Sequence, residues 1–212
     1  MPRPPRSIVP NGIYHVMSRG SNRGAIFTFD RDRYAILELL SRTVRDYDLV
    51  CHSYCLMTNH YHLVLETPDA RLSSAMKVLN GTYATQFDAR YGRTAHVFQN
   101  RFRSELVDSD AYLLTVCRYV ALNPVRAGLC RHPAEWPWSS YRALAGFDVV
   151  PEFLSESFIL SLFGDTIETA RAGFRRFVDD ELDSDRCLTP GLGELPPKRD
   201  PRGIGISRER AL

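Results

Sequence analysis

The chain has 212 residues, of which 44% are hydrophobic and 25% charged, a composition typical of a globular protein with one sizeable core. No apolar run is long enough to cross a bilayer, and the opening "MPRPPRSIVP" lacks the apolar centre of a secretory signal, so we expect a cytoplasmic protein. The five cysteines form no obvious disulfide framework and are expected to be reduced thiols: Cys51, Cys55, Cys117, Cys130 and Cys187.

Charge is distributed unevenly behind the formal net charge of +2. Residues 1–147 carry 18 basic and 12 acidic side chains, residues 148–186 carry 4 and 10, and residues 187–212 carry 5 and 3. Only Lys77 and Lys198 are lysines, and the arginine side chain suits bidentate binding of phosphate. A GC-rich coding bias explains the arginine excess equally well. The basic first part still makes nucleic acid a candidate partner.

Alternating apolar residues predict a first strand over 12–18, and a helix follows over 30–46, with Asp30 or Asp32 at its start. Two further strands over 49–57 and 60–66 are separated by a tight turn, which favours a hairpin. A second long helix is predicted over 72–90.

The second part of the chain contains one more strand, over 102–107, and then a helix that begins at Asp108 or Ser109. Pro124 is expected to bend or end this helix. The order β-α-β-β-α-β is typical of an α+β, ferredoxin-like fold, in which two helices cover one face of an antiparallel sheet. We expect the helix at 109–122 to cover the other face. Two shorter helices are predicted at 155–163 and 166–181.

Two histidines, His60 and His62, lie two residues apart in the predicted third strand, so both side chains point to the same face of the sheet. Tyr61, Leu63 and Leu65 point to the opposite face, where the two long helices should pack. Paired imidazoles are common metal ligands, but a structural pair of buried histidines is the default for a bare H-x-H pattern. Zinc binding by nearby Cys51, His52 and Cys55 is less favoured than burial of two small thiols.

A second pair of residues, Tyr119 and Asn123, is spaced four apart on the predicted helix at 109–122 and therefore shares one helix face. Asn123 offers a carbonyl oxygen suited to Mg²⁺ or Mn²⁺, and Tyr119 offers a hydroxyl. If this helix covers the open face, the four side chains converge. The structural alternatives are a half-buried aromatic for Tyr119 and a helix C-cap before proline for Asn123.

The chain resembles the single-tyrosine HUH transposases, and most closely the REP-associated tyrosine transposases. Five segments in order carry the resemblance: "YHVMSRGSNRGAIF", "CLMTNHYHLVLE", "HVFQNRFRSELV", "RYVALNPVRAGL" and "WPWSSYRAL". They span roughly residues 8–145. The middle HUH position is Tyr61, where an aliphatic residue is more usual, and we expect its ring to pack similarly.

The resemblance implies a ferredoxin-like sheet with a catalytic helix across its open face, and cleavage and rejoining of single-stranded DNA near hairpins. Carried over, Tyr119 is the nucleophile, which leaves a 5′-phosphotyrosine and a free 3′-OH, and His60, His62 and Asn123 bind a divalent Mg²⁺ or Mn²⁺ ion. The domains are then a catalytic domain at 8–147, an acidic helical extension at 148–186 and a disordered basic tail at 187–212. Family members include monomers and homodimers, which leaves the site open to assembly in cis or in trans. Bound to DNA, the protein would lie with the nucleoid.

Arginines near the predicted site are candidate DNA contacts: Arg19, Arg23, Arg101, Arg103, Arg118 and Arg126. Phe98 and Phe102 alternate with two of them and could stack on bases, although burial in the strand is the stronger interpretation for Phe102. Trp136, Trp138 and Tyr141 are expected to pack the connector after the helix onto the body. The acidic 148–186 segment could cover the basic surface and restrain it. Two other functions stay open: a hairpin-binding module without chemistry, and an H-x-H metallohydrolase.

Overall fold

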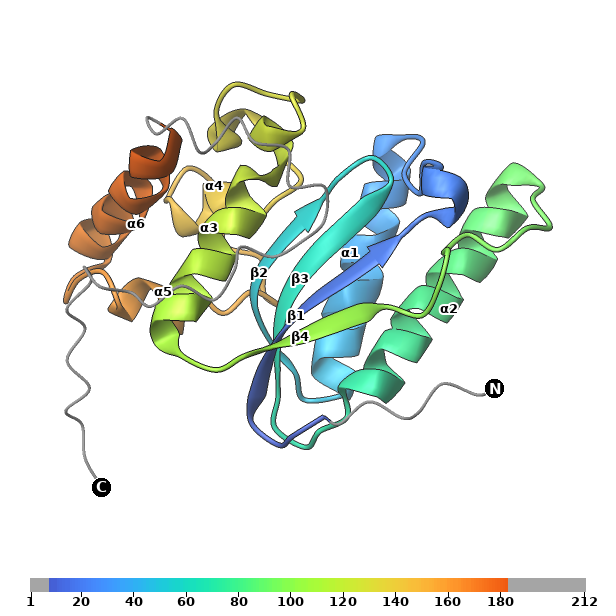
Figure 1. Ribbon diagram of the computed structural model, residues 1–212, viewed down its shortest axis with the longest axis horizontal. Coiled ribbons are helices and arrows are strands. Elements are labelled where there is room, and N and C mark those ends of the chain that lie inside the picture. Colours follow the sequence, from blue (N-terminus) through green and yellow to red (C-terminus); the bar gives the residue numbers. More distant parts are fainter. Residues whose placement is uncertain (1–7, 183–212) are drawn as a thin grey trace.

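The computed structural model describes residues 8–182, and its centre is one four-stranded antiparallel sheet (Figure 1). The strands are β1 (Gly12–Arg19), β2 (Val50–Leu56), β3 (His60–Thr67) and β4 (Arg103–Val107), and they lie in the order β2-β3-β1-β4. Each predicted strand is present to within about two residues, including the β2–β3 hairpin. The predicted tail at 187–212 lies outside the described residues.

Two long helices, α1 (Asp30–Asp46) and α2 (Leu72–Tyr91), pack side by side on one face of the sheet (Figure 1). Tyr61 and Leu63 of β3 face Ile36 of α1 and Leu79 of α2. The predicted ferredoxin-like α+β architecture is therefore confirmed. Alternation within β3 then sends His60 and His62 to the other face.

The third long helix, α3 (Asp110–Arg126), packs on β2 and also contacts β3 and β4. It begins at Ser109, whose side-chain oxygen accepts a hydrogen bond from the Tyr112 amide. The helix continues two residues beyond Pro124, so the prediction that this proline bends or ends it is wrong about the end. Because Pro124 lies in the last turn, few hydrogen bonds remain for its ring to disrupt, and the chain turns away at Gly128, which has a φ of 68°.

The free edge of β2 is covered by the connector that follows α3. The Leu56 amide donates to the Trp138 carbonyl (2.8 Å), and the Ser140 amide donates to the Tyr54 carbonyl (2.9 Å). Trp136 donates from Nε1 to the Leu56 carbonyl, and Tyr141 is fully buried, so the predicted packing role of these aromatic residues is confirmed. This backbone pairing removes an edge that could otherwise aggregate.

Short helical segments complete the described chain: η1 (Ser21–Arg23), η2 (Pro133–Glu135), α4 (Tyr141–Leu144) and α5 (Ser157–Ser161). The last helix, α6 (Ile167–Leu182), lies against α3 on the side away from the sheet (Figure 1). The two helices predicted in the acidic segment are thus present, the first of them shorter than expected. Among the described residues, none of the helices has the length and apolarity needed to span a membrane.

Candidate active site between the sheet and α3

Three histidines from two strands meet on the face of the sheet that α3 approaches. His60 and His62 come from β3, and His15 comes from β1, where it shares a face with Arg19, the residue directly opposite His60. The rings of His15 and His62 are stacked with centroids 5.0 Å apart, and His60 is edge-on to His62 at 5.0 Å. The register of β1 against β3 therefore builds a compact imidazole cluster.

Hydrogen bonds fix the orientation of both histidines of the pair. His62 Nδ1 lies 2.8 Å from His15 Nε2, and His60 Nδ1 lies 2.7 Å from Asn59 Oδ1. Burial lowers the pKa of His15 and of His60 to about 4, with the Arg19 charge adding to the effect at His60, and burial lowers the pKa of His62 well below its usual value. All three rings are therefore neutral near pH 7, which is the form that binds metals.

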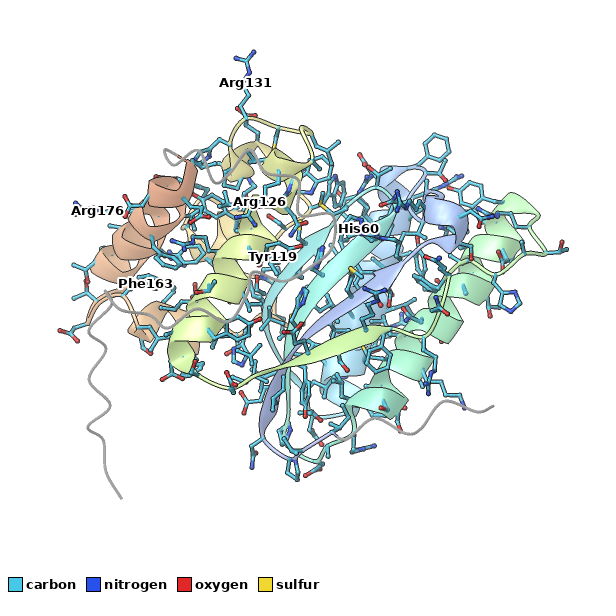
Figure 2. The ribbon with its side chains drawn as sticks, viewed as in Figure 1. His60, Tyr119, Arg126, Arg131, Phe163 and Arg176 are labelled. Atoms are coloured by element: carbon cyan, nitrogen blue, oxygen red, sulfur yellow. The ribbon has the colours of Figure 1, made fainter. Side chains whose placement is uncertain are left out.

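Tyr119 of α3 lies directly against this cluster. Its ring is perpendicular to those of His62 and His15, with centroid distances of 5.7 Å and 6.1 Å. Figure 2 shows Tyr119 and Arg126 on α3 beside the end of β3 that carries His60. Burial raises the pKa of the Tyr119 hydroxyl, opposed by the Asn123 side chain and by the charges of Arg126 and Arg19. The hydroxyl of Tyr119 is thus protonated near neutral pH.

Two buried polar atoms in this contact have no hydrogen-bond partner among the described residues: Tyr119 Oη and His62 Nε2. The Asn123 amide lies close enough to affect the phenol, but its only hydrogen bond of standard geometry runs from Nδ2 to the Tyr119 carbonyl, 2.9 Å away. Tyr141 Oη also lacks a partner, but its ring packs on Phe174. The unsatisfied hydroxyl of Tyr119 differs because it lies against the histidine cluster.

The histidine pair fits a divalent metal ion. Each Nδ1 is occupied by a partner, which leaves both Nε2 atoms for ligation, and the unpartnered Nε2 of His62 is an orphaned buried acceptor. Within residues 8–182, no group of three or more His, Cys, Asp or Glu side chains is arranged to hold a metal. A third protein ligand would therefore have to be an oxygen such as Asn123 Oδ1, which the Nδ2 hydrogen bond leaves free. Asn123 lies inside the helix, so its interpretation as a C-cap is wrong.

Four of the six arginines predicted to contact DNA are found in three different surroundings. Arg19 is at the end of β1 on the histidine face, and its charge acts on His60 and Tyr119. Arg103 and Arg101 are exposed at and just before β4, and Arg103 is close enough to lower the pKa of Arg19. Arg23 is exposed at the end of the tight turn η1. A Cβ on Gly20 would come within 2.1 Å of the Gly24 carbonyl oxygen, which explains glycine there.

Arg118 and Arg126 instead join α3 to α6. Both pair with Glu181, at 3.2 Å and 3.3 Å, and the Arg118 guanidinium lies 4.2 Å from the centroid of the Phe177 ring. Arg126 also lies 5.2 Å from the Tyr119 ring centroid. The acidic segment thus covers these two arginines, and their contact with DNA stays a prediction.

Sequence analysis missed His15 and Asn59, the two partners that orient the pair. His15 points to the same face of β1 as Arg19, which could have indicated that it lies near the predicted site. Only the register of β1 against β3, however, brings His15 to His62. Phe102 is buried and the half-buried Phe98 packs on Tyr61 and Tyr83, so neither forms an exposed stacking surface. Cys51 and Cys55 are buried thiols, as expected, and His52 contacts Glu66 rather than a metal site.

Comparisons with known proteins identify the family of the chain. The model of the family described as "Transposase IS200 like" matches residues 8–123, more than half of the chain. A Haemophilus influenzae protein named as a REP-associated tyrosine transposase is 22% identical over 159 residues, which cover 63% of this chain and 89% of that protein. A solved REP-associated tyrosine transposase, bound to a REP hairpin, superposes with a TM-score of 0.59 at 18% identity, covering 73% of this chain and 92% of that one. The chain therefore belongs to the IS200-like transposase family, and its resemblance to the REP-associated tyrosine transposases is confirmed.

Proposed function

We propose that this transposase cleaves single-stranded DNA at the foot of a hairpin and rejoins it through a covalent bond to Tyr119. The observation that supports the proposal most strongly is the contact between Tyr119 and His62, because within residues 8–182 neither the buried Tyr119 hydroxyl nor the buried His62 Nε2 has a hydrogen-bond partner. Unsatisfied buried polar atoms are unfavourable by about 1–3 kcal/mol each, so two in one contact point to a ligand that completes them.

In the proposed reaction, Tyr119 Oη attacks a phosphorus atom of the DNA and the 3′-oxygen of the upstream fragment leaves. The downstream fragment stays attached as a 5′-phosphotyrosine, which conserves the phosphodiester for rejoining by a free 3′-OH. The Arg19 and Arg126 charges favour loss of the Tyr119 proton and oppose the effect of burial.

His60 and His62, with the Asn123 carbonyl oxygen as third ligand, would hold Mg²⁺ or Mn²⁺. When bound, the ion would polarise the scissile phosphate and stabilise charge in the transition state. His15 and Asn59 hold the two imidazoles with their Nε2 atoms available. The histidine pair and Tyr119 meet within one chain, which supports an active site assembled in cis. A homodimer stays a prediction.

The hairpin substrate is proposed by similarity, because the solved relative is bound to a REP hairpin. Exposed Arg23, Arg101 and Arg103 supply positive charge near the histidine face for the DNA backbone.

End-labelled hairpin DNA distinguishes the proposal from its two alternatives. With divalent metal, 3′-labelled DNA should become linked to protein on a denaturing gel, and 5′-labelled DNA should give a shorter free fragment. Shorter fragments from both labels without a protein-linked band would indicate a metallohydrolase. Binding with no cleavage would indicate a recognition module.

A further inference from the structure

Two aromatic side chains at the start of α1 are exposed to an extent that packing does not explain. Phe29, the residue before the helix, is 57% exposed, and Tyr34 in its second turn is 65% exposed. Trp138 of the connector lies edge-on to Tyr34, with ring centroids 5.0 Å apart. Phe29 is flanked instead by Arg31, whose guanidinium also lies 5.6 Å from the ring centroid of Tyr91 on α2. We call Phe29, Tyr34 and Trp138, at these two places around the start of α1, the aromatic platform.

Arginine side chains are interleaved with these rings. The Arg31 guanidinium lies 5.1 Å from the centroid of Phe29, and that of Arg33 lies 5.4 Å from the centroid of Trp138. Arg33 pairs with Asp30 at 3.2 Å, whereas no ion pair of Arg31 is found among the described residues. Flat rings next to guanidinium groups are the chemistry that binds unpaired bases and their phosphates.

The platform lies at the end of the sheet that carries the histidine pair. The amides of Ile26 and Phe27, just before Phe29, donate to the Thr58 carbonyl, two residues before His60. On the other side, the Trp138 carbonyl accepts from the amide of Leu56. The segments that carry the platform therefore flank the β2–β3 turn. Because α1 covers the face of the sheet opposite His60, a DNA strand held at His60 would reach the platform by passing around this end of the sheet.

We propose that the aromatic platform binds unpaired bases of single-stranded DNA beside the cleaved phosphate. This inference rests on the proposed function. It adds a site for stacking of bases to the DNA contacts predicted for the six arginines. The positive charge of Arg31 favours an anionic partner over a neutral or basic protein surface, and the exposed flat rings favour unpaired bases among anionic partners. Stacking accepts any base, so the subsite holds the strand without selecting its sequence.

Binding is best measured in a Tyr119→Phe background, where cleavage does not consume the DNA. The probe is a fluorescent DNA hairpin with a single-stranded flank, followed by anisotropy. Phe29→Leu and Tyr34→Leu keep apolar bulk but remove the ring. Phe147→Leu is the matched control, because Phe147 is 47% exposed and has Arg175 at 5.6 Å from its ring centroid.

Each platform variant should weaken binding by about tenfold, and the control by less than twofold, with unchanged thermal unfolding. Replacing single flank nucleotides by abasic sugars keeps the phosphates and removes the bases. At the stacked positions the abasic DNA should bind the parent protein about tenfold more weakly, and the platform variants should show no further loss.

Platform variants that bind as tightly as the parent overturn the inference, as does a loss that persists on DNA whose whole flank is abasic. If the protein with Tyr119 forms the covalent adduct while the platform variants bind normally, the proposed function stands and only the subsite fails. If neither adduct nor DNA binding is found, both fail. Tight binding of the platform to a protein in place of DNA would also contradict the proposal.

Discussion

Two buried tyrosines on opposite faces of the same sheet differ in what their hydroxyl groups contact. Tyr61, on the face covered by α1 and α2, donates to Asn80 Oδ1 at 2.5 Å, and Asn80 Nδ2 in turn donates to Ser18 Oγ at 2.9 Å. Tyr119, on the other face, has no partner for its hydroxyl among the described residues. The tyrosine hydroxyl on the helix-covered face is thus satisfied within the described residues, and the one on the other face is not.

The same contrast extends to the charged and titratable groups. Beside α1 and α2, the buried Asp32 carboxylate accepts hydrogen bonds from two backbone amides, from Tyr91 and from Arg90. Beside α3, the buried His62 keeps one ring nitrogen unpartnered. The hydrogen bonds of Asp32 link the two long helices, whereas Tyr119 Oη and His62 Nε2 are unsatisfied atoms that the proposed function assigns to the DNA and the metal.

The largest effect should come from exchanging the two tyrosines for phenylalanine. Tyr119→Phe should abolish the covalent adduct and leave DNA binding intact, because the substitution removes only the nucleophilic oxygen. Tyr61→Phe should retain cleavage and lose about 1 kcal/mol of stability, since Asn80 Oδ1 loses its donor. Equal loss of cleavage in both variants, by denaturing gel, would remove the distinction between the two faces.

The next largest effect concerns the histidine pair. His60→Ala and His62→Ala should each lower metal-dependent cleavage more than about a hundredfold, because each removes a proposed ligand. The measurement is the cleavage rate against Mg²⁺ or Mn²⁺ concentration, with His132→Ala as a control distant from the cluster. Rates unchanged at limiting metal would contradict the assignment of these ligands.

On the helix-covered face, Asp32→Asn should lower the free energy of unfolding by about 3 kcal/mol, because it weakens a buried, hydrogen-bonded ion pair. Burial raises the pKa of Asp32, but hydrogen bonds from Phe29, Tyr91 and the other donors hold it below its usual value. Its stabilisation is therefore present above about pH 4 and is lost as the pH falls through the lower folded pKa. Urea titrations between pH 3 and 7 should show a flatter pH dependence for Asp32→Asn, and an identical dependence would refute this role.

The smallest effect is expected at His15. As a neutral ring, His15 can accept a hydrogen bond from the Nδ1–H of His62 and so keep His62 Nε2 unprotonated and available to the metal. His15→Leu should weaken Mn²⁺ binding by about ten- to hundredfold, and His15→Gln, which retains an acceptor, should weaken it less. Paramagnetic resonance of free Mn²⁺ measures this without any reaction. Equal affinities in the Leu and Gln variants would show that His15 only packs.

Patterns among neighbouring residues in the sequence were sufficient to predict most of the fold and half of the candidate site. Strand alternation separated His60 and His62 from Tyr61, and helical spacing placed Tyr119 with Asn123, because both depend on neighbours in sequence. The end of α3 was not predictable from Pro124 alone, since the effect of a proline depends on how much helix follows it.

Contacts between distant segments account for what the sequence did not reveal. His15 contacts His62 only because of the register between β1 and β3. Arg118 contacts α6 because it forms an ion pair with Glu181 and packs on the Phe177 ring. Stacking on bases was one interpretation of Phe98 and Phe102, with burial favoured for Phe102, and the structure buries Phe102 fully and Phe98 in part. The exposed rings are instead on α1, where no sequence motif marked them.

Peptide mapping of the DNA–protein adduct tests the central claim most directly. The tryptic peptide over residues 119–126 contains Tyr119 as its only tyrosine. After reaction with hairpin DNA and nuclease trimming, mass spectrometry should find a 5′-phosphonucleotide on this peptide, with fragment ions that place it on Tyr119. An adduct on another residue, or DNA cleavage with no adduct, would contradict the account.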